Sequence, residues 1–446
     1  MNKINLLLFV YIFLFPFVAI SQNPIVLVNA DSIVGYKMNE NPVRDFIGAV
    51  HLRQRNIELF CNKATHFIAE NRVILIGDVR IVQDTLVLMS DYIEYDGNKS
   101  VANSLSKVEI KEPQNYLKAN YGTYYFKNKL ANFFDEVIYE EKNVKLKAKR
   151  VDFDRANDIV YAFNNVKLET DSLILLCDTL VYARTTKNLS AYSNVQTFAK
   201  YESLEILSGC MLIDQKNKLS RSFNKPELRL IDTIKVESDT TKYKLDTLFL
   251  FADTLISETK DTVTKFKFIH NVKLFKEKIT TIGDYGELHR ESQWGYLVGS
   301  PFLWYDSTEF KGDSLYFVMK NRKISFIEFV NNSSILSPSN YDTLYIHKIQ
   351  SDTLRIYFSD NKINHILGLG RVKTNYFLKD EETNEIQLAN YTSDSIRIHF
   401  LDNEVNNVVW YGNVDGEVIP EIIFKKNLSN YYTISKDFLI KKPKLY

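Results

Sequence analysis

The chain has 446 residues, and its 56 Lys and Arg against 55 Asp and Glu leave a formal net charge of +1. Nucleic acid is therefore not an expected partner, because binding to a phosphate backbone needs a basic surplus. Hydrophobic residues make up 45% of the chain, enough for a large core, which excludes a disordered protein.

The N-terminus has the features of a secretory signal peptide. Lys3 precedes an apolar run from Leu6 to Ile20, and Ala19 and Ser21 are small residues at the spacing that a signal peptidase needs. We expect cleavage after Ser21 and a mature protein in the periplasm. The alternative is an uncleaved anchor, although the run is short for a helix that spans a bilayer. Association with the inner or the outer membrane stays open.

A two-residue marker recurs along the rest of the chain, a small residue followed in most copies by Asp or Asn. From Asn62 to Asp91, Asn120, Lys149 and Asp178, each step is 29 residues. Twelve markers occur in all, and the first residue is always Ala, Ser, Cys or Gly. We interpret the chain as about twelve copies of a repeat of roughly 29 residues.

Apolar residues alternate with polar ones on both sides of each marker, and the alternation changes phase at the marker, as in Ser172–Tyr182. Alternation with period two predicts strands that bury one face, and a change of phase indicates a bulge or bend. We therefore predict an all-β protein in which bent strands stack as a solenoid-like body. The Asp or Asn can bond to backbone groups that the bend frees. The predicted bend residues are Asp31, Asn62, Asp91, Asn120, Asp178, Asp253, Asp284, Asp313, Asp352 and Asp394.

Marker spacing divides the chain into predicted regions. The signal peptide (residues 1–21) is followed by a first repeat tract at residues 22–222 and a second at residues 245–423. The step from Gly209 to Asp253 is 44 residues long, which predicts a polar insertion or linker at residues 223–244. Residues 424–446 form a basic tail without the repeat pattern.

Motifs for catalysis, cofactors or metal ions do not occur in the sequence. The seven histidines fall at no metal-ligand spacing, and neither a Gly-rich phosphate loop nor a nucleophile elbow is present. We expect neither an enzyme nor a cofactor. A glycosidase-type carboxylate pair stays open, because such residues meet only in the fold. The three cysteines are an odd number, so at least one thiol is free.

Two segments share a pattern with a known family. The better match combines Gly77–Ile81 with Leu86–Asp96 and Val101–Asn103, and Asn165–Leu168 with Leu173–Tyr182 is similar. These segments resemble the OstA/LptA-like proteins of lipopolysaccharide transport. The resemblance implies an open, V-shaped β-jelly-roll, often called a β-taco, whose apolar groove holds the acyl chains of lipopolysaccharide or another glycolipid. It also implies edge strands that pair with other Lpt-type proteins or with a second copy.

The apolar positions beside the markers supply the groove candidates. They are Leu59, Leu86, Leu88, Leu117, Leu146, Leu173 and Leu175. The sequence leaves open which wall faces the groove and whether the two walls gape or pack together. A ligand-free structural or adhesive β-solenoid therefore remains the alternative function, and a polysaccharide-active enzyme on a β-helix is a third.

Overall fold

The computed structural model describes residues 23–236, 239–339, 345–359, 361–380, 382–401, 404–426 and 442–445. The predicted signal peptide and most of the predicted tail lie outside these residues. The described residues form 32 antiparallel strands and one short helix, so the all-β prediction is confirmed. The chain divides into two compact units, Met1–Asp135 and Glu136–Tyr446.

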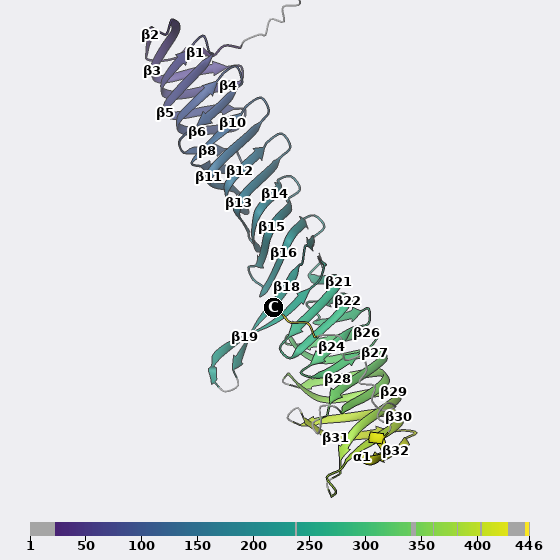
Figure 1. The fold of residues 1–446 in the computed structure, drawn as a ribbon. Coiled ribbons are helices and arrows are strands. Elements are labelled where there is room, and N and C mark those ends of the chain that lie inside the picture. The colour runs from purple at the N-terminus through teal and green to yellow at the C-terminus, as the bar shows by residue number, and fades with distance from the viewer. Residues whose placement is uncertain are drawn as a thin grey trace, which may run out of the picture. The chain divides into compact units, whose positions relative to one another are not determined.

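The first unit contains ten strands, drawn from purple to blue in Figure 1. Their bounds are β1 (Val26–Asn29), β2 (Ser32–Met38), β3 (Asn41–Gln54), β4 (Ile57–Phe67), β5 (Arg72–Gln83), β6 (Leu86–Asp96), β7 (Val101–Ser104), β8 (Val108–Lys111), β9 (Asn115–Ala119) and β10 (Tyr121–Tyr125). The next strand, β11 (Leu130–Glu141), crosses the boundary between the units.

The second unit contains the remaining strands and the helix. The strands of its first half are β12 (Val144–Asp154), β13 (Ile159–Thr170), β14 (Leu173–Ala183), β15 (Asn188–Ala199), β16 (Leu204–Asp214), β17 (Leu219–Phe223), β18 (Glu227–Val236), β19 (Asp239–Phe251), β20 (Thr254–Lys260), β21 (Val263–Lys276) and β22 (Ile279–His289). They are followed by β23 (Trp294–Val298), β24 (Phe302–Tyr305), β25 (Thr308–Lys311), β26 (Ser314–Lys320), β27 (Lys323–Pro338), β28 (Ile346–Ser359), β29 (Lys362–Lys379), β30 (Ile386–Leu401), β31 (Glu404–Tyr411), β32 (Asp415–Pro420) and α1 (Glu421–Lys426).

Most long strands change register with both neighbours near the middle, and this divides each unit into two walls. In the pairing of β4 with β5, one run ends at Phe60 opposite Arg80, and the next starts at Lys63 opposite Ile76. We call wall A of the first unit the half-strands aligned with Ile57–Phe60, and wall B those aligned with Lys63–Phe67. In the second unit, wall A contains Val166–Glu169 of β13 and wall B contains Ile159–Phe163.

The segment predicted as a polar insertion, residues 223–244, is largely strand. β18 pairs with β19 from Glu227 opposite Phe251 to Val236 opposite Asp239, and Figure 1 shows this pair as a long hairpin. At the other end of the second unit, Phe424 of α1 is fully buried. It packs with four other apolar side chains, Tyr345, Phe377, Leu388 and Ile419. The tract boundaries predicted from marker spacing stay predictions.

Candidate functional site

The bends that separate the walls have a recurring backbone geometry. The strands that carry the markers alternate with strands that carry two consecutive residues with positive φ, and these pairs lie at the register breaks. In the first unit the pairs are Gly48–Ala49 and Gly77–Asp78, and the pair Asp135–Glu136 of β11 spans the boundary between the units. In the second unit they are Asn164–Asn165, Ser193–Asn194, Asn224–Lys225, His270–Asn271, Gly299–Ser300, Asn331–Asn332, Gly370–Arg371 and Gly412–Asn413. Gly, Asn and Asp tolerate this left-handed conformation best, which explains their frequency there.

The structure places all ten predicted bend residues at these breaks, and several bond across to the left-handed pair. The Asn62 amide donates to Asp78 at 2.9 Å, and the Asn194 amide donates to Asp178 at 2.7 Å. Other cross-strand pairs are Asn120–Asp135, Asn271–Asp253, Asn332–Asp313, Arg371–Asp352 and Asn413–Asp394. The backbone N–H of Asp31, Asn120, Asp253, Asp313 and Asp394 also donates to carbonyls of the partner strand. The partner side chains on the second strand were not predicted from the sequence. Their signal was an Asp or Asn directly before a valine, as in Asp78-Val79, Asn165-Val166 and Asn194-Val195.

The inner face of wall A in the first unit carries an unbroken row of aliphatic residues. Each member lies directly opposite the next on the neighbouring strand, in the order Leu52, Leu59, Ile81, Leu88, Ile110 and Leu117. All six side chains are 2% exposed or less. The row thus forms one continuous apolar strip across six strands.

The second unit repeats this arrangement over more strands. Its row follows the strand pairing through Leu146, Leu168, Leu175, Thr197, Ile206, Leu228, Leu250 and Leu274. It continues through Thr281, Leu303, Phe310, Ile335, Ile349 and Thr374. Three threonines interrupt an otherwise apolar strip, and every member is buried.

The predicted groove leucines all lie on the inner faces of wall A. Leu59, Leu88 and Leu117 belong to the row of the first unit, and Leu86 lies beside them and is fully buried. In the second unit, Leu146 and Leu175 belong to the row, whereas Leu173 is partly exposed at the end of its strand. Ile81 and Ile110, which lie between these leucines in the row, were not among the candidates. The same alternation of apolar and polar residues marks them in the sequence.

The inner side chains of both walls are largely buried, and polar contacts join the free rims of the two walls. We call this line of contacts the seam. In the first unit, the Tyr95 hydroxyl donates to the Gln54 side chain at 2.6 Å, and the Gln54 amide donates to the Gly97 carbonyl at 2.8 Å. In the second unit, the Tyr182 hydroxyl donates to Glu141 at 3.1 Å. Burial raises the pKa of both tyrosines, so they remain neutral donors at physiological pH.

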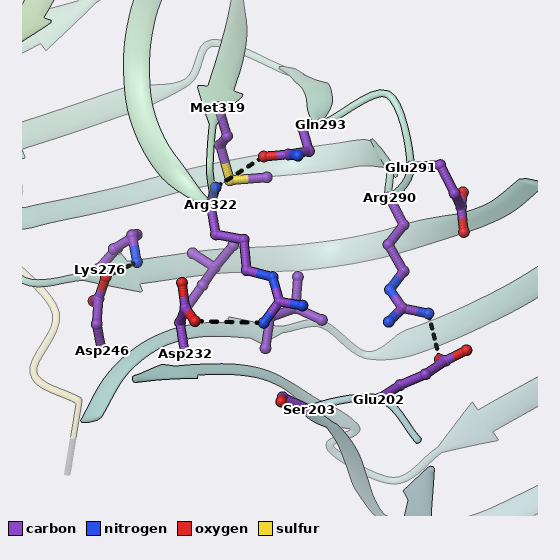
Figure 2. Close-up of a pocket in the computed structure, with 12 residues that line it drawn as sticks. Glu202, Ser203, Asp232, Asp246, Lys276, Arg290, Glu291, Gln293, Met319 and Arg322 are labelled. Carbon is purple, nitrogen blue, oxygen red and sulfur yellow. Dashed lines mark hydrogen bonds and ion pairs between the residues drawn. The ribbon is translucent and has the colours of Figure 1, made fainter. Parts of the chain in front are cut away.

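Ion pairs close the seam farther along the second unit. Figure 2 shows Arg290 paired with Glu202, and Arg322 paired with Asp232 at 3.6 Å. In each pair, the carboxylate comes from the rim of wall A and the guanidinium from a turn of wall B. These contacts hold the two rims together at several points, and an acyl chain would enter only where the walls separate.

The described residues contain no group of three or more His, Cys, Asp or Glu side chains placed to hold a metal ion. Cys61, Cys177 and Cys210 are free thiols at or beside the bends. Burial raises the pKa of Cys61 to about 11 and that of Cys177 to about 12, so both are unreactive thiols. Across the described part of the chain, no helix has the length and apolarity of a membrane span.

Comparison with known proteins gives one family match. Residues 22–136 match the family model described as OstA-like protein. The resemblance stated above is confirmed over these residues, which include the better-matching segment Gly77–Asn103, and beyond them it stays a prediction. No curated protein sequence matches the chain.

The comparison with solved structures gives a weaker similarity. The chain resembles LptH, described as the LptA-homologous periplasmic component of the lipopolysaccharide transport device of Pseudomonas aeruginosa. The two are 14% identical, and the match covers 32% of this chain and 95% of LptH with a TM-score of 0.25. A TM-score this low supports no conclusion about the function of this chain.

Proposed function

We propose that this protein is a periplasmic lipid-binding bridge that carries lipopolysaccharide or a related glycolipid towards the outer membrane. The observation that carries the proposal is the buried and mostly apolar row on the inner face of wall A in each unit. The match of residues 22–136 with the OstA-like family model supports it. The protein acts by binding and not by catalysis.

Acyl chains would bind by replacing contacts between the two walls. Burial of apolar surface is worth about 25 cal/mol per Å², so several chains lying along a row gain affinity without a charged site. Because each strand offers a similar side chain, lipid can move from one strand to the next without meeting a single deep pocket. The seam contacts must open along the way, which sets the barrier to lipid entry.

The alternative function is a ligand-free structural or adhesive β-solenoid. The closed interior favours it, since residues such as Leu59 and Leu88 are already buried by protein. The two functions differ in one respect that can be measured, namely whether lipid reaches the inner row while the protein stays folded.

The N-terminal end of the first unit, formed by β1 and β2, is suited to pairing with another β-protein. β1 and β2 bond only to β3 among the described strands, and each has one unpaired edge. Leu27 lies opposite buried Leu52, and Ile33 lies opposite buried Phe46, yet the two are 36% and 55% exposed. An unpaired edge with uncovered apolar side chains templates strand addition. We propose that another Lpt-type β-taco protein, or a second copy, adds a strand here.

Photo-crosslinking tests lipid binding. A photo-reactive residue at Leu88, Leu117, Leu146 or Leu175 should crosslink lipopolysaccharide, because these four positions face the interior. The matched control is Met89, the neighbour of Leu88, which alternation directs to the outer face. Leu117→Asp should impair transport, whereas Lys118→Asp should not. Normal folding without a crosslink at any inner position would establish the ligand-free solenoid instead.

Pairing at the edge has a separate test. Val34 of β2 is 51% exposed, and Val34→Pro removes one backbone donor from the strand. This variant should lose self-association or binding to a β-taco partner while its interior lipid crosslinks persist. Unchanged association would show that β2 is not the docking edge.

A further inference from the structure

The seam of the second unit contains a cavity that the apolar rows do not explain. It has a volume of about 340 Å³ and lies beside the ion pairs Glu202–Arg290 and Asp232–Arg322. Figure 2 shows these side chains around one space, with Lys276 and Asp246 at its far side. The volume falls within the range of roughly 300–1,000 Å³ typical of small-molecule sites. No predicted groove leucine lines it.

One buried carboxylate in the lining is only half satisfied. Asp246 is 3% exposed and Lys276 is 5% exposed, and the Lys276 ammonium donates to Oδ2 of Asp246 at 2.6 Å. The other oxygen, Oδ1, is buried and has no hydrogen-bond partner among the described residues. Leaving a buried acceptor unpaired costs free energy. Because Oδ1 has almost no accessible surface, a donor on a ligand reaches it only if the Asp246 side chain turns towards the cavity. The cavity therefore favours a ligand with at least one hydroxyl or N–H group.

The charges of the lining argue against an anionic ligand. Its three cations, Lys276, Arg290 and Arg322, are each paired with a carboxylate. With Glu291 as a fourth carboxylate against three cations, the formal charge of the lining is −1. A phosphate or carboxylate would meet no unpaired cation there, and it would be repelled by the net charge.

The remaining lining completes the pattern. Leu230, Leu248 and Met319 provide an apolar patch beside the charged groups, and the Gln293 side chain accepts from the Arg322 backbone N–H at 2.8 Å. Donors, acceptors and an apolar surface thus occur within one small space. A sugar ring presents the same mixture, since its hydroxyls both donate and accept and its C–H face is apolar.

We infer that this cavity is a binding site for a neutral saccharide. The guanidinium groups and carboxylates at the mouth bind hydroxyls of the sugar, and a further hydroxyl donates to Oδ1 of Asp246 once that side chain turns towards the cavity. The saccharide is either free or the headgroup of a glycolipid, and the cavity recognises the same chemistry in both. The inference goes beyond the proposed function, because it requires no acyl chain in the interior.

The test compares maltose with decyl maltoside below its micelle concentration, using saturation-transfer difference NMR on the mature full chain. Ser203 is exposed and lines the cavity, so Ser203→Trp should block it and weaken binding at least tenfold. The matched control is Lys216→Trp, which puts the same side chain in the exposed turn after β16, outside the cavity lining. Arg290→Gln, which replaces the guanidinium with a shorter neutral amide, should also weaken binding. Circular dichroism establishes that each variant is folded.

The outcomes separate the two sources of the sugar. Maltose binding that Ser203→Trp abolishes supports a site for free saccharide. Binding of decyl maltoside alone, lost in the same variant, supports a glycolipid headgroup. The inference is wrong if neither probe shows binding that Ser203→Trp weakens. It is also wrong if ethanolamine displaces both probes, because ethanolamine is a small cation and the site would then recognise positive charge. Because the interior crosslinks at Leu88 and Leu117 do not involve this cavity, they would still decide the proposed function independently.

Discussion

The most specific prediction concerns the bends, because a left-handed backbone conformation and a hydrogen bond both depend on one residue. Asn194 has φ +52°, and its amide donates to Asp178 at 2.7 Å. In Asn194→Ala, a left-handed residue other than Gly or Asn costs about 1 kcal/mol. Loss of the hydrogen bond costs about another 1 kcal/mol. The expected destabilisation is therefore about 2 kcal/mol.

Three companion variants separate these contributions. Asn194→Gly loses the bond but keeps an easy left-handed backbone, so it should cost about half as much. Asp178→Ala also loses only the hydrogen bond, so its destabilisation should be similar to that of Asn194→Gly. Ser193 is also left-handed, at φ +59°, and has no special tolerance for this conformation. Ser193→Gly should stabilise the bend by up to about 1 kcal/mol.

Hydrogen exchange is the suitable assay, since stability in stacked repeats is local. Amides of β14 and β15 around the bend should exchange roughly 30-fold faster in Asn194→Ala than in the wild type. This factor follows from about 2 kcal/mol, because each 1.4 kcal/mol changes the equilibrium constant for opening tenfold. Amides of β4 and β5 in the first unit serve as the internal control. Equal losses of protection in Asn194→Ala and Asn194→Gly would refute the argument that backbone conformation matters at the bend.

Three further predictions concern packing and pH. Leu88→Ala should destabilise the first unit by about 2–5 kcal/mol in urea unfolding, whereas Leu105→Ala, at a residue 66% exposed, should be nearly neutral. Ala119 is 1% exposed beside a bend, so Ala119→Leu should lower the melting temperature by overpacking, at about 1–3 kcal/mol, and Ala156→Leu in an exposed turn should not. Burial lowers the pKa of His347 to about 4, from an ordinary value of about 6.5. The unfolded chain therefore takes up this proton first, so stability is full above about pH 6.5 and falls as the pH drops towards 4. His347→Gln should flatten this part of the pH profile, and an unchanged profile would exclude His347 as its cause.

Local pattern determined the class of fold. Alternation with period two shows which side chains are buried, because successive residues of a strand point to opposite faces. The marker showed where each strand bends, since a change of phase requires a bulge. For these reasons the sequence alone was enough to predict an all-β chain and to mark Leu59, Leu88 and Leu117 as groove candidates, while it left open which wall faces the groove.

Contacts between distant segments were decided only by the tertiary structure. The sequence assigned Asp178 a bond to nearby backbone, but its side-chain partner, Asn194, lies on the next strand and follows from the register. Whether the walls gape or close depends on contacts such as Gln54 with Tyr95 and Glu202 with Arg290, which lie 41 and 88 residues apart. Such pairs leave no periodic signal, because each depends on how two rims meet in space. The seam and its cavity are therefore properties of the fold and not of the repeat.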